Sequence, residues 1–73
     1  MDEIEYGVFW KTVYCDKWDK FGTWTASYGV VRDLYEFALS EKLCTAAKIV
    51  KKVTNTVTTY EDVEVKEKDD DKS

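Results

Sequence analysis

The chain has no histidine, and it has only three glycines and two cysteines among 73 residues. Histidine is the commonest general base, a frequent metal ligand and the usual partner of a serine or cysteine nucleophile. Glycine-rich loops of the kind that cradle phosphates are also absent, and so short a chain has little room for a concave catalytic pocket. These absences predict a protein that is not an enzyme and that uses no cofactor.

The cysteines and acidic residues do not form a pattern typical of a metal or redox site. Cys15 and Cys44 are far apart in sequence and make no CxxC pair, so we expect two reduced, inert thiols. Asp16 and Asp19 lack the alternating acids and distal glutamate of a calcium-binding loop. The sequence therefore predicts no metal site.

Long hydrophobic runs are missing as well. No stretch of 18 apolar residues occurs, and the acidic start MDEIEYG lacks the positive and apolar regions of a signal peptide. We expect a soluble cytoplasmic protein that does not associate with a membrane.

What the chain does have is aromatic residues, at 15%, and an acidic balance, with 15 acidic against 11 basic residues and a net charge of −4. Aromatic side chains bury about 150–250 Å² each and dominate small cores and interfaces. The negative charge argues against a protein whose main task is to hold a phosphate backbone.

The first half of the chain has the period-two pattern of β-strands. Residues 4–18 carry large side chains at even positions, residues 23–31 form a second strand-like run, and Gly22 suits a loop at 19–22. This turn would place Trp18 opposite Trp24 and Tyr14 opposite Tyr28. One side of the predicted hairpin would then carry Trp10, Tyr14, Trp18, Trp24, Tyr28 and Val30.

A helix and a second hairpin are predicted next. Asp33 followed by Glu36 is typical of a helix start, with the helix running through the apolar residues near Leu39. Residues 46–53 and 56–65 are rich in β-branched side chains, and Asn55 suits the turn between them. A helix over 46–53 is the competing interpretation, which the surrounding Ile, Val, Thr and Tyr disfavour.

These elements predict an α+β fold of two layers, ββαββ, in which one short helix packs on one face of a four-stranded antiparallel sheet. We expect a single domain over residues 1–65 and a disordered charged tail over 66–73, since the tail has nothing to bury. The order of the strands is not determined by the pattern.

The aromatic hairpin is the candidate binding surface, because a helix this short would leave the rings near the hairpin tip uncovered. Large exposed rings commonly mark a protein contact. The predicted partner-binding residues are Trp18, Phe21, Trp24, Tyr14 and Lys17. We accordingly expect a small module that binds a larger protein.

Two alternatives remain open at this stage. Rings on a sheet beside lysines are also used to bind single-stranded nucleic acid, with Lys48, Lys51 and Lys52 as the contacts. An exposed aromatic face or strand edge could instead form a homodimer, which would help so small a core.

The segments 32–42 (RDLYEFALSEK) and 47–53 (AKIVKKV) give the chain a resemblance to small phage- or prophage-encoded proteins that combine a hairpin, one short helix and further strands. Proteins of that type often bind and modulate one host protein. The resemblance therefore implies an inhibitor or modulator, and it assigns no residue a role.

Overall fold

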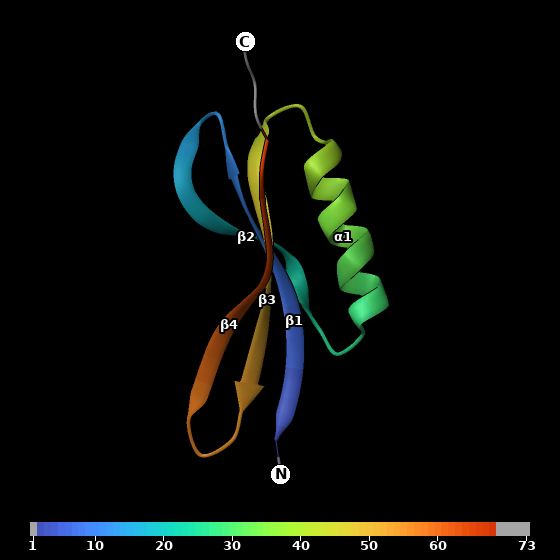
Figure 1. Cartoon of the computed structure of the whole chain (residues 1–73), viewed down its shortest axis with the longest axis vertical. Helices are drawn as coiled ribbons and strands as arrows, with labels where there is room; N and C mark the ends of the chain where they lie inside the picture. The colour runs from blue at the N-terminus through green and yellow to red at the C-terminus, as the bar shows by residue number, and fades with distance from the viewer. Residues whose placement is uncertain (1, 69–73) are drawn as a thin grey trace.

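The computed structural model describes residues 2–68, which form four strands and one helix in the order ββαββ. The elements are β1 (Glu3–Thr12), β2 (Cys15–Thr25), α1 (Tyr28–Ser40), β3 (Cys44–Thr54) and β4 (Thr58–Glu67). The strands make one antiparallel sheet and the helix packs on it (Figure 1). The predicted fold class is confirmed.

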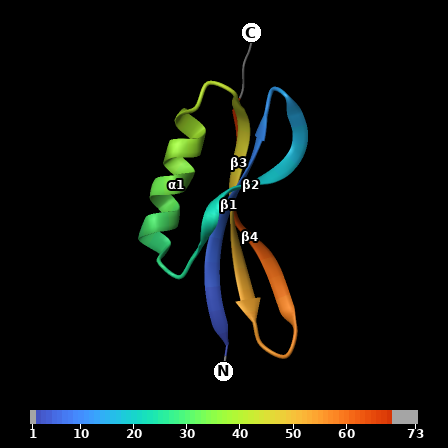
Figure 2. The same cartoon turned by 180° about the vertical axis from the view of Figure 1, so that it is seen from behind.

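The strand order is β2-β1-β3-β4, so β1 and β3 are central and β2 and β4 are the edges. Seen from the front and from behind, α1 lies alone on one side of the sheet (Figures 1 and 2). Its 13 residues span about 20 Å, whereas the molecule is 48 Å long. The start of β1 and the β3–β4 turn extend beyond the helix, and within residues 2–68 no helix lies on the other side of the sheet.

The core lies between α1 and the sheet. Val8 of β1 and Ile49 of β3 are partners in the sheet, and both are fully buried beneath Val31 and Tyr35 of the helix. The other members of this cluster are Ala38, Cys44 and Ala47, with Tyr6, Trp10, Phe21, Leu34 and Leu39 partly buried around it.

The predicted turn of the first hairpin is wrong. The chain reverses at Val13 and Tyr14, because Thr12 pairs with Cys15, and residues 19–22 lie inside β2. The backbone N–H of Val13 donates to the carbonyl of Leu43 at 2.9 Å. A contact with the loop after the helix thus holds this turn, which has none of the glycine or asparagine that usually mark one.

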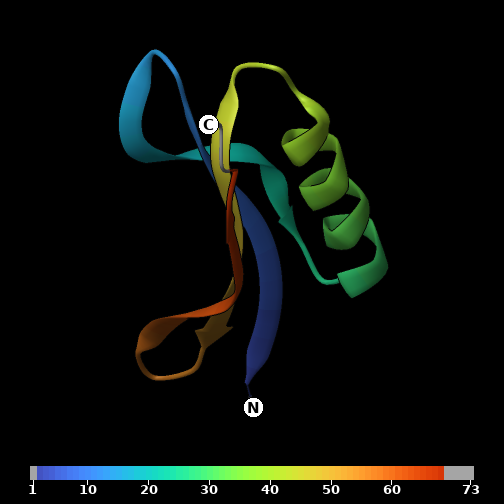
Figure 3. The same cartoon turned by 45° about the horizontal axis from the view of Figure 1, so that its top comes forward.

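Gly22 has the positive φ expected of it, 82°, but it serves a bulge rather than a turn. Gly7 alone separates Tyr6 from Val8, while residues 22–24 separate their partners Thr25 and Phe21. This bulge and a second one nearer the hairpin tip accompany the strong bend of β2 (Figure 3). Trp18 and Trp24 therefore belong to the same strand and are not a cross-strand pair.

The helix begins five residues earlier than predicted, at Tyr28 rather than Asp33. Ser27 is the N-cap, and its hydroxyl accepts a hydrogen bond from the backbone N–H of Val30 at 3.3 Å. The β-favouring side chains of residues 28–31 suggested a strand, but Val31 is fully buried against the sheet as part of the helix. Tertiary packing overrides local propensity here.

The second hairpin is confirmed, with strand rather than helix over residues 46–53 and the turn at residues 55–57. β4 continues two residues past the expected end of the domain, to Glu67, and Lys68 donates its backbone N–H to Thr45. This part of the predicted tail is therefore ordered, and the rest of it, 69–73, lies outside the described residues.

Candidate functional site

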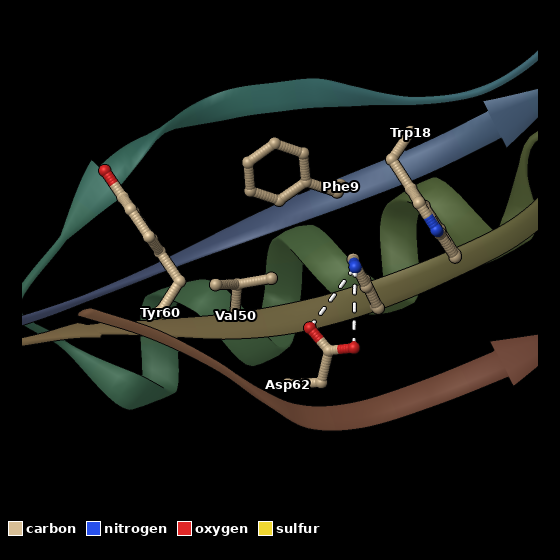
Figure 4. Close-up of a pocket in the computed structure, with 6 residues that line it drawn as sticks. Phe9, Trp18, Val50, Tyr60 and Asp62 are labelled. Atoms are coloured by element: carbon tan, nitrogen blue, oxygen red, sulfur yellow. Dashed lines mark hydrogen bonds and ion pairs between the residues drawn. The ribbon is translucent and has the colours of Figure 1, made fainter.

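The side of the sheet that α1 does not cover carries its own aromatic cluster. Strand side chains alternate between the two faces, so Phe9 faces away from the helix while Val8 and Trp10 face it. We call this surface the helix-free face; it comprises the rings of Phe9, Trp18, Trp24 and Tyr60 and the lysines Lys11, Lys20, Lys48 and Lys52. Figure 4 shows the part of this face around Phe9, Trp18 and Tyr60, with the helix behind the sheet.

Trp24 lies directly over Gly7 in the middle of this face. A Cβ atom at residue 7 would be 2.8 Å from Trp24 Cε3 and 2.9 Å from Lys20 Cε. The missing side chain of Gly7 therefore makes the space for both. The Trp24 ring then contacts Phe9 and Tyr60, with centroids 5.9 and 6.0 Å away.

Each tryptophan of the helix-free face is accompanied by two lysines. Lys20 Nζ and Lys52 Nζ lie 4.8 and 4.5 Å from the centroid of Trp24. Lys11 Nζ and Lys48 Nζ lie 4.8 and 4.6 Å from that of Trp18. Such cation–π contacts contribute about 0.5–1 kcal/mol each at exposed sites, and the lysine stems cover part of the rings.

Three of these four lysines are paired with carboxylates. Lys48 lies 3.2 Å from Asp62, Lys52 lies 3.1 Å from Glu5, and Lys11 lies 4.0 Å from Asp16. Positive charge on this surface is therefore largely neutralised by the chain's own acids.

Lys20 is the exception. Among residues 2–68 no carboxylate lies within 4.0 Å of its Nζ, which donates instead to the carbonyl oxygen of Gly22 at 2.9 Å. Burial lowers the pKa of Lys20, and the neighbouring charge of Lys52 lowers it further. Both effects disfavour the charged form of Lys20, and within residues 2–68 no carboxylate offsets them by a close ion pair.

A hollow opens between the rings. Its volume is about 280 Å³, and it is lined by Phe9, Trp18, Lys48, Val50, Tyr60 and Asp62. Val50 is only 4% exposed, and the Lys48–Asp62 ion pair forms one wall (Figure 4). Ligand pockets are usually about 300–1,000 Å³, so this hollow suits one large side chain or one base.

Two other hollows are larger but contain no aromatic side chain. One, of about 430 Å³, lies at the β3–β4 turn, and the other, of about 370 Å³, lies where α1 meets the end of β4. Most residues that line them have polar or charged side chains, so the aromatic hollow is the better candidate for an apolar ligand group.

The structure separates the predicted partner-binding residues. Trp18 and Trp24 are on the helix-free face, whereas Phe21 faces the helix and packs against Trp10 and Phe37 at 4.5 and 5.9 Å. Tyr14, 82% exposed, stands at the turn of the first hairpin, and Lys17 is exposed beside Trp18 in sequence. These five residues do not form one surface.

The predicted nucleic-acid contacts are divided in the same way. Lys48 and Lys52 lie on the helix-free face, while Lys51, the partner of Tyr6 in the sheet, belongs to the opposite side. Sequence reasoning missed Phe9, Lys11, Lys20 and Tyr60. Phe9 could have been found from its odd position in the first strand, but nothing in the sequence brings Lys20 or Tyr60 beside it.

The two thiols differ in environment. Cys15 is exposed, and Cys44 is buried with its Sγ donating to the carbonyl oxygen of Ala46 at 3.3 Å. Burial raises the pKa of the Cys44 thiol. Within residues 2–68, no three His, Cys, Asp or Glu side chains lie close enough together to hold a metal ion. In the same range, no helix is long and apolar enough to cross a membrane.

In comparisons with known proteins, no protein-family model, no curated protein and no solved structure matches this chain.

Proposed function

We propose that the protein is a small non-enzymatic module that binds a larger protein through its helix-free face. The observation that carries this proposal is the aromatic hollow beside Trp18, which lies on the side of the sheet without a helix. Contact surfaces commonly have large apolar anchors at the centre and charged groups at the rim. Phe9, Trp18 and Tyr60 would form the centre, and the Lys48–Asp62 and Lys52–Glu5 pairs would form the rim.

Charge supports a protein partner over a phosphate backbone. Asp62 and Glu5 sit among the lysines, and the chain has a net charge of −4. A phosphodiester strand lying on this face would have to pass both carboxylates. A protein surface can instead place a lysine or arginine side chain beside each carboxylate. If the partner is a host protein, the module would act as its inhibitor or modulator.

The test is affinity capture from the source cell with three baits: the natural protein, Trp18→Ala and Phe37→Ala. Phe37 is the matched control, because it is a ring 56% exposed on the helix, away from the helix-free face. We expect a stoichiometric partner to be retained by the natural protein and by Phe37→Ala and lost by Trp18→Ala. Retention by all three baits would contradict the proposal.

Binding to single-stranded nucleic acid is the second candidate, and the pairing of each tryptophan with two lysines favours it. Bases stack on such rings, and phosphates pair with such lysines. This function predicts that a 15-nucleotide oligo-dT binds at low salt, more weakly as salt rises. Lys48→Met should weaken that binding and Lys51→Met should not, since Lys51 is on the other side. No binding at 25 mM salt would remove this candidate.

Homodimerisation stays a prediction. β4 is an exposed edge strand, but Glu61, Asp62 and Glu64 lie along it, and charged edges oppose strand pairing between copies.

A further inference from the structure

Lys20 and Lys52 approach the same ring from the same face of the sheet. Their Nζ atoms lie 4.8 and 4.5 Å from the centroid of Trp24, and the charge of Lys52 adds to burial in lowering the pKa of Lys20. Glu5 relieves this repulsion at Lys52, at 3.1 Å, but no carboxylate among residues 2–68 relieves it at Lys20. A single negative charge from outside would complete this arrangement.

The place for that charge adjoins the aromatic hollow. Lys20 Nζ is 5.8 Å from the ring of Phe9, and Phe9 lines the hollow. Trp24, over which Lys20 lies, is 6.0 Å from Tyr60, which lines the hollow from the other side. An apolar group in the hollow would therefore have the Lys20 ammonium group close to it.

We infer that the helix-free face recognises a peptide segment in which a large apolar side chain is followed or preceded within two residues by Asp or Glu. The apolar side chain enters the hollow between Trp18 and Tyr60, and the carboxylate pairs with Lys20. This inference rests on the proposed function and names the chemistry of its partner.

A peptide carboxylate fits better than a phosphate strand. Counting the carboxylates of residues 2–68, Lys20 alone among the four lysines of the face has none within 4.0 Å, so the surface is complementary to one added negative charge. Asp62, 54% exposed in its side chain, borders the hollow and would repel a second. An isolated acidic side chain beside an apolar one meets both conditions.

The test begins with selection of random 12-residue peptides displayed against the natural protein. The best binders are resynthesised with their acidic residue changed to the corresponding amide, and each pair is titrated against the natural protein, Lys20→Met and Lys51→Met. Methionine keeps an apolar stem over Gly7, and Lys51→Met is the same change on the opposite side of the sheet. Lys20→Arg, which retains the charge, checks that Lys20→Met has not simply disturbed Trp24.

We expect the selected peptides to combine a large apolar residue with a nearby acid. Loss of the acid should weaken binding about three- to fivefold with the natural protein, Lys20→Arg and Lys51→Met, the size of a partly exposed ion pair. With Lys20→Met, replacing the acidic residue of the peptide by its amide should change the affinity by less than about 1.5-fold, because the cation that the acid would pair with is gone.

Peptides that lose affinity with Trp18→Ala but show no acid requirement, or whose acid acts independently of Lys20, would overturn the inference and leave the binding module standing. Oligo-dT binding that depends on Lys20 and displaces the peptides would overturn the assignment to a peptide. If no peptide is selected and no captured protein depends on Trp18, both the inference and the proposed function fail.

Discussion

The two faces of the sheet use the same kind of side chain in opposite ways. On one face, Tyr6, Trp10 and Phe21 pack around a core closed by the helix. On the other, the rings of Phe9, Trp18 and Trp24 are covered by lysine side chains instead. Both β1 and β2 supply rings to each face, because successive side chains of a strand point to opposite faces: Tyr6 and Trp10 lie opposite Phe9 in β1, and Phe21 lies opposite Trp18 and Trp24 in β2.

The difference between the faces lies in what covers the rings. Apolar side chains of the helix, aliphatic and aromatic, cover the rings on one face, and their removal leaves a cavity. Lysine side chains cover a ring while keeping their charged ends in water, and they can move aside when a partner arrives. Aromatic content alone therefore does not distinguish a core from a contact surface, whereas the residue type packed over each ring does.

Of the substitutions that distinguish the two faces, one beneath the helix is expected to cause the largest loss of stability. Ile49→Ala removes a fully buried side chain and should lower the free energy of unfolding by about 2–5 kcal/mol, because the helix cannot close the cavity completely. Urea unfolding followed by tryptophan fluorescence measures this. A loss below about 1 kcal/mol would mean that the helix-bearing face is not the principal core.

A smaller loss is expected where the helix-free face is most tightly packed. In Gly7→Ala the new methyl group would meet Trp24 at 2.8 Å and Lys20 at 2.9 Å, so we expect a cost of about 1–3 kcal/mol. Because the clash is with Trp24, adding Trp24→Ala should make the two changes non-additive. Gly29→Ala is the control: its Cβ would meet only Ser27 Oγ, at 3.8 Å. Equal losses for both glycines would contradict this packing.

The smallest effect concerns alkaline pH and the helix-bearing face. Burial raises the pKa of Tyr35, helped by the Glu64 carboxylate, and burial raises the pKa of Cys44. The folded chain therefore holds these protons more tightly than the unfolded chain, whose values are near 10.0 and 9.0. Stability should be full below pH 9 and fall above it. The lowered pKa of Lys20 acts in the opposite direction.

Tyr35→Phe tests this directly. The Tyr35 hydroxyl is buried and makes no hydrogen bond of normal geometry with any of residues 2–68, although Glu64 is close enough to affect its pKa. Its removal should change stability at pH 7 by less than about 1 kcal/mol and should flatten the alkaline loss. Urea midpoints at pH 7, 9 and 10.5 measure both. An unchanged slope would show that Tyr35 does not contribute to the loss.

The sequence was sufficient for the fold class but not for the surface. Period-two alternation identified strands, and the turn at Asn55 followed from turn chemistry. The turn of the first hairpin could not be predicted in this way, because Val13 and Tyr14 are not typical turn residues and Val13 is held by a hydrogen bond to Leu43. This error moved the predicted partners of Trp18 and Trp24.

Half of the helix-free face was found in advance, in Trp18, Trp24, Lys48 and Lys52, and its other members were not. Side chains of β2 still alternate between the two faces, but its bulges shift the pairing with β1 between Cys15 and Asp19 and again between Phe21 and Thr25, so partners counted back from the hairpin turn are wrong. The meeting of Lys20 with Phe9 depends on these bulges, and that of Tyr60 with Trp24 depends on a strand order that alternation does not encode.

The central claim is that the rings covered by lysines serve a partner rather than the fold. Urea unfolding of the natural protein and of Trp18→Ala, each with and without a selected peptide, tests it in one experiment. We predict that Trp18→Ala costs about 1–2 kcal/mol, the value of two cation–π contacts, and that the peptide at 100 times its Kd adds about 2.7 kcal/mol to the natural protein and little to the variant. A loss of about 3–5 kcal/mol, as for a core ring, with equal stabilisation of both proteins by the peptide, would contradict the claim.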